Sequence, residues 1–97
     1  MSKIKELVMY ERRDKDDYSI LTAKIEDDGN LMLEGYDIGD FPESFWGDSD
    51  YEYWLLINKD YKDTILLWLI KERFTNDSEF REWLNEKGIP SEFDSWV

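Results

Sequence analysis

Carboxylates are the most abundant groups in this chain that could do chemistry. The 97 residues include 24 Asp and Glu against 12 Lys and Arg, with no His and no Cys. Without His and Cys the chain cannot assemble a Ser-His-Asp or Cys-His arrangement, or a zinc site of the usual ligand set. It also lacks the GxGxxG, Walker A and HExxH patterns. We therefore expect a protein that is not an enzyme and needs no cofactor.

The acidic residues that begin at Asp48 have part of the spacing of a calcium-binding loop. Such a loop places oxygen ligands at positions 1, 3, 5 and 12 and a glycine at position 6. Asp48, Asp50 and Glu52 fit the first three positions, but Tyr53 and Lys59 occupy positions 6 and 12. The spacing thus fails for an EF-hand, and a looser Ca²⁺ or Mg²⁺ site at Asp48 and Asp50 stays an alternative.

The distribution of charge along the chain is more informative than its total. The net charge of −12 argues against binding to nucleic-acid phosphates or anionic lipid, because both require a basic patch. No basic residue lies between Lys24 and Lys59. This acidic segment is either a solvated face without a function or a surface that attracts a basic protein. Its ten carboxylates are Glu26, Asp27, Asp28, Glu34, Asp37, Asp40, Glu43, Asp48, Asp50 and Glu52.

Aromatic side chains lie within the same acidic segment. Phe41, Phe45 and Trp46 are interleaved with carboxylates in a stretch that Gly and Pro residues mark as a loop. Such rings serve as anchors in protein interfaces, where surrounding polar groups form the rim. The alternative is a small cluster that holds the turn against the sheet. If the segment binds a partner, the predicted binding residues are Asp37, Asp40, Glu43, Phe45, Trp46, Asp48, Asp50 and Glu52.

Four strands are expected to position these residues. Apolar and β-branched patterns predict strands over residues 4–12, 18–25, 31–36 and 51–58. The Asp-Gly pair at 28–29 predicts a hairpin turn, because Gly tolerates positive φ. The first three strands are therefore expected to form an antiparallel meander. The fourth is expected to be a central strand, because its second face is only half polar.

The last of these strands carries two tyrosines with the spacing of core residues. Tyr51 and Tyr53 share one face with Leu55 and Ile57 at a period of two. Core packing is therefore the better interpretation for both tyrosines. Trp54, on the other face, is expected to pack under a helix or against a neighbouring strand.

Two helices are expected after the strands. Asp60 is a candidate N-cap for a helix that runs to about residue 74, and its apolar run at 65–70 predicts burial on more than one side. Asn76 and Glu79 have capping-box spacing for a second helix, which Gly88 ends.

The expected fold is α+β, because the strands precede the helices. It consists of a mostly antiparallel sheet of four to five strands, with the two C-terminal helices packed on one face. Residues 91–97 form either the fifth strand or an extended tail. Residues 1–97 are expected to form a single domain.

The chain contains no segment that suggests a membrane or an exported protein. Its longest apolar run, residues 65–70, is too short to cross a bilayer. The first residues lack the apolar core of a signal peptide. A cytoplasmic location is therefore expected by default. Whether the protein is a monomer or a homodimer is left open.

Two short patterns give the chain a resemblance to a known group of proteins. The first is a Gly-x-Asp-x-Gly turn at Gly35, Asp37 and Gly39, and the second is the Gly-Asp-Ser-Asp-Tyr-Glu-Tyr stretch at residues 47–53. From Leu31 onward the chain resembles small acidic bacterial proteins of unassigned function, although the second pattern has one extra residue in its spacing. In size and charge these proteins are similar to immunity proteins, which neutralise bacterial toxins.

The resemblance implies a non-catalytic protein that inhibits a basic toxin domain, such as a nuclease. It supplies no established active site. Two alternatives stay open. One is a nucleic-acid mimic, as in phage proteins that block DNA-binding enzymes, and the other is a small carboxylate-based protein that binds divalent metal ions.

Overall fold

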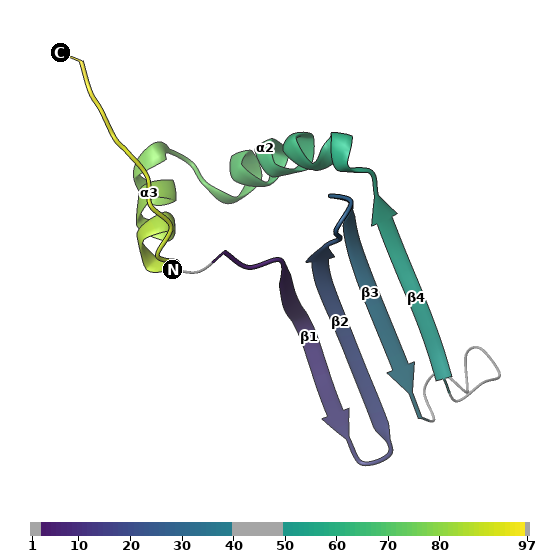
Figure 1. The fold of residues 1–97 in the computed structure, drawn as a ribbon. Helices are drawn as coiled ribbons and strands as arrows, with labels where there is room; N and C mark the ends of the chain where they lie inside the picture. The colour runs from purple at the N-terminus through teal and green to yellow at the C-terminus, as the bar shows by residue number, and fades with distance from the viewer. Residues whose placement is uncertain (1–2, 40–49, 97) are drawn as a thin grey trace. The chain divides into compact units, whose positions relative to one another are not determined.

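The computed structural model describes residues 3–39 and 50–96. The chain divides into two compact units, one from Ile4 to Lys62 and the other from Asp63 onward. The first unit is a β-sheet and the second is helical (Figure 1). The expected α+β composition is confirmed. The expectation of a single domain, with the helices on one face of the sheet, stays a prediction.

The sheet unit is an antiparallel meander of four strands (Figure 1). The spatial order is β1-β2-β3-β4, which confirms the meander of the first three strands. The expectation that the fourth strand is central was wrong, because β4 pairs only with β3 and lies at an edge of the described sheet. The strand boundaries are β1 (Glu6–Asp14), β2 (Asp17–Ile25), β3 (Leu31–Ile38) and β4 (Asp50–Ile57).

The turn between β2 and β3 forms where the Asp-Gly pair predicted it. Gly29 has a φ of +95°, a conformation that a residue with a Cβ rarely adopts. The amide of Glu26 donates to the carbonyl of Asn30 over 2.8 Å, and the carboxylate of Asp28 accepts from the amide of Asn30 over 3.1 Å. The turn thus satisfies its own polar groups and fixes the β2–β3 register.

The pairing register assigns the side chains to two faces of the sheet, because directly opposite residues share a face. We name each face after one residue of β4, Tyr53 for one face and Trp54 for the other. The Tyr53 face carries Leu7, Tyr10, Arg12, Ser19, Leu21, Ala23, Ile25, Leu31, Leu33, Gly35, Asp37, Tyr51, Tyr53, Leu55 and Ile57. The Trp54 face carries Glu6, Val8, Glu11, Arg13, Tyr18, Ile20, Thr22, Lys24, Met32, Glu34, Tyr36, Ile38, Asp50, Glu52, Trp54 and Leu56. The Tyr53 face is mainly apolar, whereas the Trp54 face mixes charged, aromatic and apolar groups.

The segment that follows β4 differs from the sequence expectation. A 3-10 turn, η1 (Lys59–Tyr61), follows β4, and the amide of Asp60 donates to the side chain of Asn58 over 2.8 Å. Asn58 is therefore the N-cap of this turn, and the assignment of Asp60 as the N-cap was wrong. The first α-helix is α2 (Lys62–Arg73).

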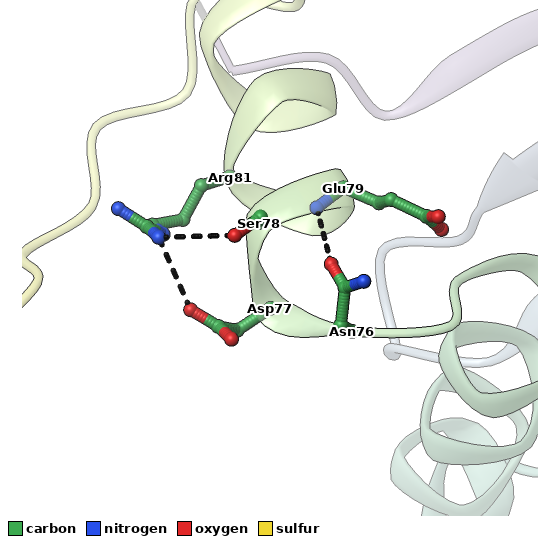
Figure 2. Close-up of polar contacts among 5 residues, drawn as sticks. All are labelled: Asn76, Asp77, Ser78, Glu79 and Arg81. Carbon is green, nitrogen blue, oxygen red and sulfur yellow. Dashed lines mark hydrogen bonds and ion pairs between the residues drawn. The ribbon is translucent and has the colours of Figure 1, made fainter.

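The second helix, α3 (Asp77–Glu86), begins at the predicted cap (Figure 2). The side chain of Asn76 accepts a hydrogen bond from the amide of Glu79 over 3.0 Å. The carboxylate of Glu79 accepts from the amide of Thr75 over 2.9 Å, one residue earlier than in a standard capping box. One unpaired amide of the first turn, that of Glu79, is thus satisfied, and the second bond fixes the chain just before the cap.

The end of α3 is a Schellman motif. Gly88 has a φ of +69° and its amide donates to the carbonyl of Asn85 over 3.1 Å. The amide of Ile89 donates to the carbonyl of Leu84 over 2.9 Å. These are the two hydrogen bonds that define the motif, and they explain why the helix stops at the glycine.

The predicted fifth strand is absent from the described residues. Residues 89–96 form neither helix nor strand. Pro90 has no amide hydrogen to give to a ladder, and the guanidinium of Arg81 lies 3.8 Å from the centre of the Phe93 ring. The segment therefore interacts with α3 as an irregular tail.

Three aromatic rings connect the end of α2 to α3. The ring of Phe74 lies 5.0 Å from that of Phe80 and 5.8 Å from that of Trp83, measured between ring centres. These spacings are typical of favourable aromatic pairs. Among the described residues, neither helix has the length and apolar content needed to cross a membrane.

Candidate partner-binding surface

Three of the predicted binding residues lie in the described part of the sheet. Asp37 is on β3, and Asp50 and Glu52 are on β4. The other five predicted residues lie outside the described residues. They are Asp40, Glu43, Phe45, Trp46 and Asp48.

The β3–β4 register separates the three described carboxylates. Asp50 lies opposite Ile38, and Glu52 lies opposite Tyr36, so both acids are on the Trp54 face. Asp37 lies opposite Tyr51 and therefore belongs to the Tyr53 face. The structure thus brings Asp50 and Glu52 together and directs Asp37 to the other side of the sheet.

Tyr36 is the aromatic residue closest to these two acids in the register. Burial raises the pKa of its phenol above the ordinary value, and the negative charges of Asp50 and Glu52 raise it further. The phenol consequently stays protonated over a wider pH range and can donate a hydrogen bond. Both carboxylates therefore act on the same tyrosine from the edge strand.

Trp54 continues this surface along β4. It lies opposite Glu34, and its indole makes a small contribution to the lowered pKa of the Glu34 carboxyl. Lys24 binds the same carboxylate, with 2.8 Å between Nζ and Oε2. The hydrogen bond and the charge of Lys24 lower the pKa of Glu34. Trp54 lies beside this ion pair and exposes 57% of its surface.

We call Tyr36, Asp50, Glu52 and Trp54 the acidic–aromatic surface. The first and last of these were missing from the predicted site. Tyr36 was missed because its neighbours are set by pairing with a strand 16 residues further along the chain. The alternation of Glu52 and Trp54 on one strand was the available signal, since residues two apart share a face.

The opposite face of the same two strands has a different character. The ring of Tyr53 lies across Gly35, its direct cross-strand partner, and occupies the space that a Cβ at Gly35 would need. Tyr51 and Tyr53 stack with 5.4 Å between ring centres. Burial raises the pKa of Tyr53, and Asp37 adds to this effect. The two tyrosines thus pack on each other and on the sheet, but both stay partly exposed. The expected core packing is not found, because no apolar side chain is buried among the described residues and Leu55 of the same face is 57% exposed.

The described residues offer no cluster suited to a metal ion. No group of three or more Asp, Glu, His or Cys side chains lies together within residues 3–39 and 50–96. The looser site suggested by Asp48 and Asp50 includes a residue outside this range.

Comparison with known proteins gave no relative. No family model, no curated protein and no solved structure matches this chain. The acidic–aromatic surface is therefore the feature of the chain on which a proposed function can rest.

Proposed function

We propose that this protein is a non-catalytic inhibitor that binds a basic protein, in the manner of an immunity protein that neutralises a toxin domain such as a nuclease. The observation that carries the proposal is the acidic–aromatic surface, where Asp50 and Glu52 lie beside Tyr36 and the exposed Trp54. Carboxylates around aromatic rings are a common composition for the rim and anchors of a protein interface.

The charges and the rings would contribute to different steps of binding. A net charge of −12 attracts a basic partner over distance and speeds association, most strongly at low salt. Trp54 offers a large, exposed amphipathic side chain beside Glu34. Burial of such a ring mainly slows dissociation. Fast association and slow dissociation are both required of an inhibitor that must act before its target does damage.

The nucleic-acid mimic is less well supported than the inhibitor of a basic protein. A mimic needs carboxylates spaced like phosphates along one continuous surface. Asp37 and the Asp50–Glu52 pair lie on opposite faces of the sheet. The acidic segment therefore does not present these three charges as one row.

The experiment that tests this function is co-expression with the product of the immediately upstream gene. We expect the two proteins to co-purify, and we expect the toxicity or nuclease activity of that product to be lost in the presence of this protein. The variant Asp50→Asn/Glu52→Gln should associate at least about tenfold more slowly, because it lacks two steering charges.

A matched control is available in the helical unit. The variant Glu72→Gln/Glu86→Gln changes the net charge by the same amount at α2 and α3. It should associate nearly as fast as the unmodified protein if the acidic–aromatic surface is the binding site. Equal slowing by both double variants would mean that only the total charge matters. Co-purification with undiminished toxicity would contradict the inhibitor proposal.

A further inference from the structure

β4 is an edge strand with few of the features that usually protect an edge. Sheet edges are commonly blunted by a bulge, a proline, charged side chains, especially lysine, or a short length. The charged side chains of β4 are both acidic, Asp50 and Glu52. β4 has eight residues, its register with β3 is continuous, and Asp50–Ile57 contains neither Pro nor Lys. By contrast, the register of β1, the other edge, shifts between Val8 and Tyr10.

Two backbone hydrogen bonds show which residues point out of the sheet. In an antiparallel pair, successive residues direct their N–H and C=O groups to opposite neighbours. The amide of Ile25 donates to the carbonyl of Lys5, beside β1, whereas the amide of Glu26 donates to Asn30, beside β3. Even-numbered residues of β2 therefore bond to β3, and odd-numbered ones bond to β1.

The β2–β3 and β3–β4 registers have no bulge, so the same alternation of hydrogen-bonding direction continues to β4. Ile20 pairs with Tyr36 and Thr22 with Glu34, so the even-numbered residues of β3 bond to β2 and the odd-numbered ones bond to β4. Gly35 pairs with Tyr53. Odd-numbered residues of β4 consequently bond inward, and the backbone groups of Glu52, Trp54 and Leu56 point away from the sheet.

We propose that the outer edge of β4 binds an extended basic segment of the partner as a fifth strand. This inference rests on the proposed function and specifies how the partner is held. Main-chain hydrogen bonds to Glu52, Trp54 and Leu56 would supply affinity, and alternate side chains would supply specificity. The residues that offer these backbone groups also carry the side chains of the Trp54 face.

The side chains at this edge indicate which kind of partner segment would bind there. On the Trp54 face, the added strand would place alternate side chains beside Glu52 and Trp54, which favour Lys or Arg through ion pairing and cation–π contact. On the other face, its side chains would lie beside Tyr53 and Leu55 and would be apolar. A second copy of this chain is disfavoured, because each copy carries a charge of −12.

The test uses a synthetic peptide of about ten residues, the length of a typical strand, that alternates Lys and Val. Backbone amide exchange of the intact protein is followed by NMR with and without the peptide. We expect at least tenfold slower exchange at the amides of Glu52, Trp54 and Leu56. The amides of Tyr53 and Leu55 should change little, because they already bond to β3. The same peptide with alternate amides N-methylated keeps its charge but cannot pair, so it should bind at least tenfold more weakly.

Two matched variants locate the binding edge. Glu52→Pro removes an outward-pointing amide without loss of a β3–β4 hydrogen bond and should abolish amide protection by the peptide. Glu6→Pro makes the same change at an outward position of β1 and should leave it intact. Circular dichroism of both variants verifies that the sheet is retained. If a variant is not folded, the N-methylated peptide still decides the question.

Three results would overturn the edge-strand proposal. One is peptide binding without slower exchange at Glu52, Trp54 and Leu56. Another is equal affinity for the N-methylated peptide. The third is a free protein that already forms a dimer with these amides protected. If the upstream gene product is inhibited by a protein whose β4 amides stay unprotected in the complex, the proposed function stands and only the strand pairing fails.

Discussion

At the residue scale, the ring of Tyr53 packs directly on Gly35 and leaves no room for a side chain at that position. Gly35 is fully buried, and its cross-strand partner is the ring that covers it. A glycine in a strand interior costs conformational entropy, so it is kept where another group must come close. Here that group is an aromatic ring, which replaces the side chain that the glycine lacks.

The first prediction concerns this pair. Gly35→Ala should destabilise the protein by about 2 kcal/mol, because the added methyl group overlaps the Tyr53 ring and the ring must move. Urea unfolding measures the change. The double variant Gly35→Ala/Tyr53→Ala should cost clearly less than the sum of the two single changes, since the methyl group then has room. Strict additivity would show that the ring does not occupy this position.

The second prediction uses the two tyrosines whose pKa values report on opposite faces. Asp50→Asn/Glu52→Gln should lower the phenol pKa of Tyr36 part of the way toward its ordinary value, since burial is the larger cause of its rise. Asp37→Asn should lower the pKa of Tyr53 instead. Titration of ¹³C-labelled tyrosine by NMR measures the pKa values of the two phenols separately. A shift of both phenols in either variant would contradict the assignment of the acids to faces.

The same pKa shifts determine how stability depends on alkaline pH. Tyr18, Tyr36 and Tyr53 all have a raised pKa in the folded state. The unfolded chain therefore loses these protons first, and the stabilisation is complete below the unfolded value of about 10. Stability should decline as the pH rises from there through the folded values. Urea unfolding at pH 9 and at about pH 11 tests this sign, and Tyr36→Phe should reduce the decline.

At the element scale, the ends of α3 depend on residues close in sequence. The side chain of Asn76 caps the first turn, and Gly88 provides the left-handed residue at the end. Arg81 contacts both Asp77 and Ser78 in the first turn, at 3.3 Å and 3.4 Å (Figure 2). Such contacts involve neighbours three or four residues apart, which is why sequence patterns predict them well.

The third prediction concerns the contribution of this cap to the free energy of unfolding. Asn76→Ala should destabilise α3 by about 1 kcal/mol, because the amide of Glu79 loses its acceptor. Asn85→Ala makes the same change near the other end of the helix, where the side chain does not cap, and should have an effect smaller than about 0.5 kcal/mol. Urea unfolding followed by the tryptophan signal compares the two. Equal losses would mean that the Asn76 hydrogen bond does not stabilise the helix.

Strand pairing shows where prediction from the sequence reached its limit. The four strands and the turn at Gly29 followed from local patterns, because alternation and turn chemistry are local. The placement of Asp37 and Asp50 on opposite faces could not be predicted from local patterns, because it depends on which residues of β3 and β4 pair with each other. That register is set by cross-strand packing such as Tyr53 on Gly35.

The predicted strand at the C-terminus failed for a related reason. Phe93 and Trp96 are typical strand residues, but strand formation requires a partner with a free edge and a suitable register. In the described structure Phe93 instead contacts Arg81 of α3. Local propensity was therefore overridden by a contact within the helical unit.

At the scale of the whole molecule, charge and composition are the strongest indications of function. The proposed role as an immunity protein rests on acidity, small size and the lack of His and Cys for catalysis. The acidic–aromatic surface adds a specific place on the sheet where these properties coincide. The inhibitor proposal thus combines a global property, which speeds encounter, with a local one, which holds the partner.

The fourth prediction concerns salt. Association with a basic partner should slow steeply between low and physiological ionic strength, because the Debye length falls from about 30 Å at 0.01 M to about 8 Å at 0.15 M. Dissociation should change much less, since it depends on contacts such as that of Trp54. Stopped-flow association and dissociation rates at several salt concentrations test this. A dissociation rate that carries most of the salt effect would contradict the division of roles.

The most direct test of the central claim is the association rate of this protein with the upstream gene product at low salt, compared between the two charge-matched double variants. We expect Asp50→Asn/Glu52→Gln to slow association at least about tenfold and Glu72→Gln/Glu86→Gln to stay within about twofold of the unmodified protein. Equal rates for the two variants would contradict the claim that the acidic–aromatic surface of β3 and β4 is the binding site.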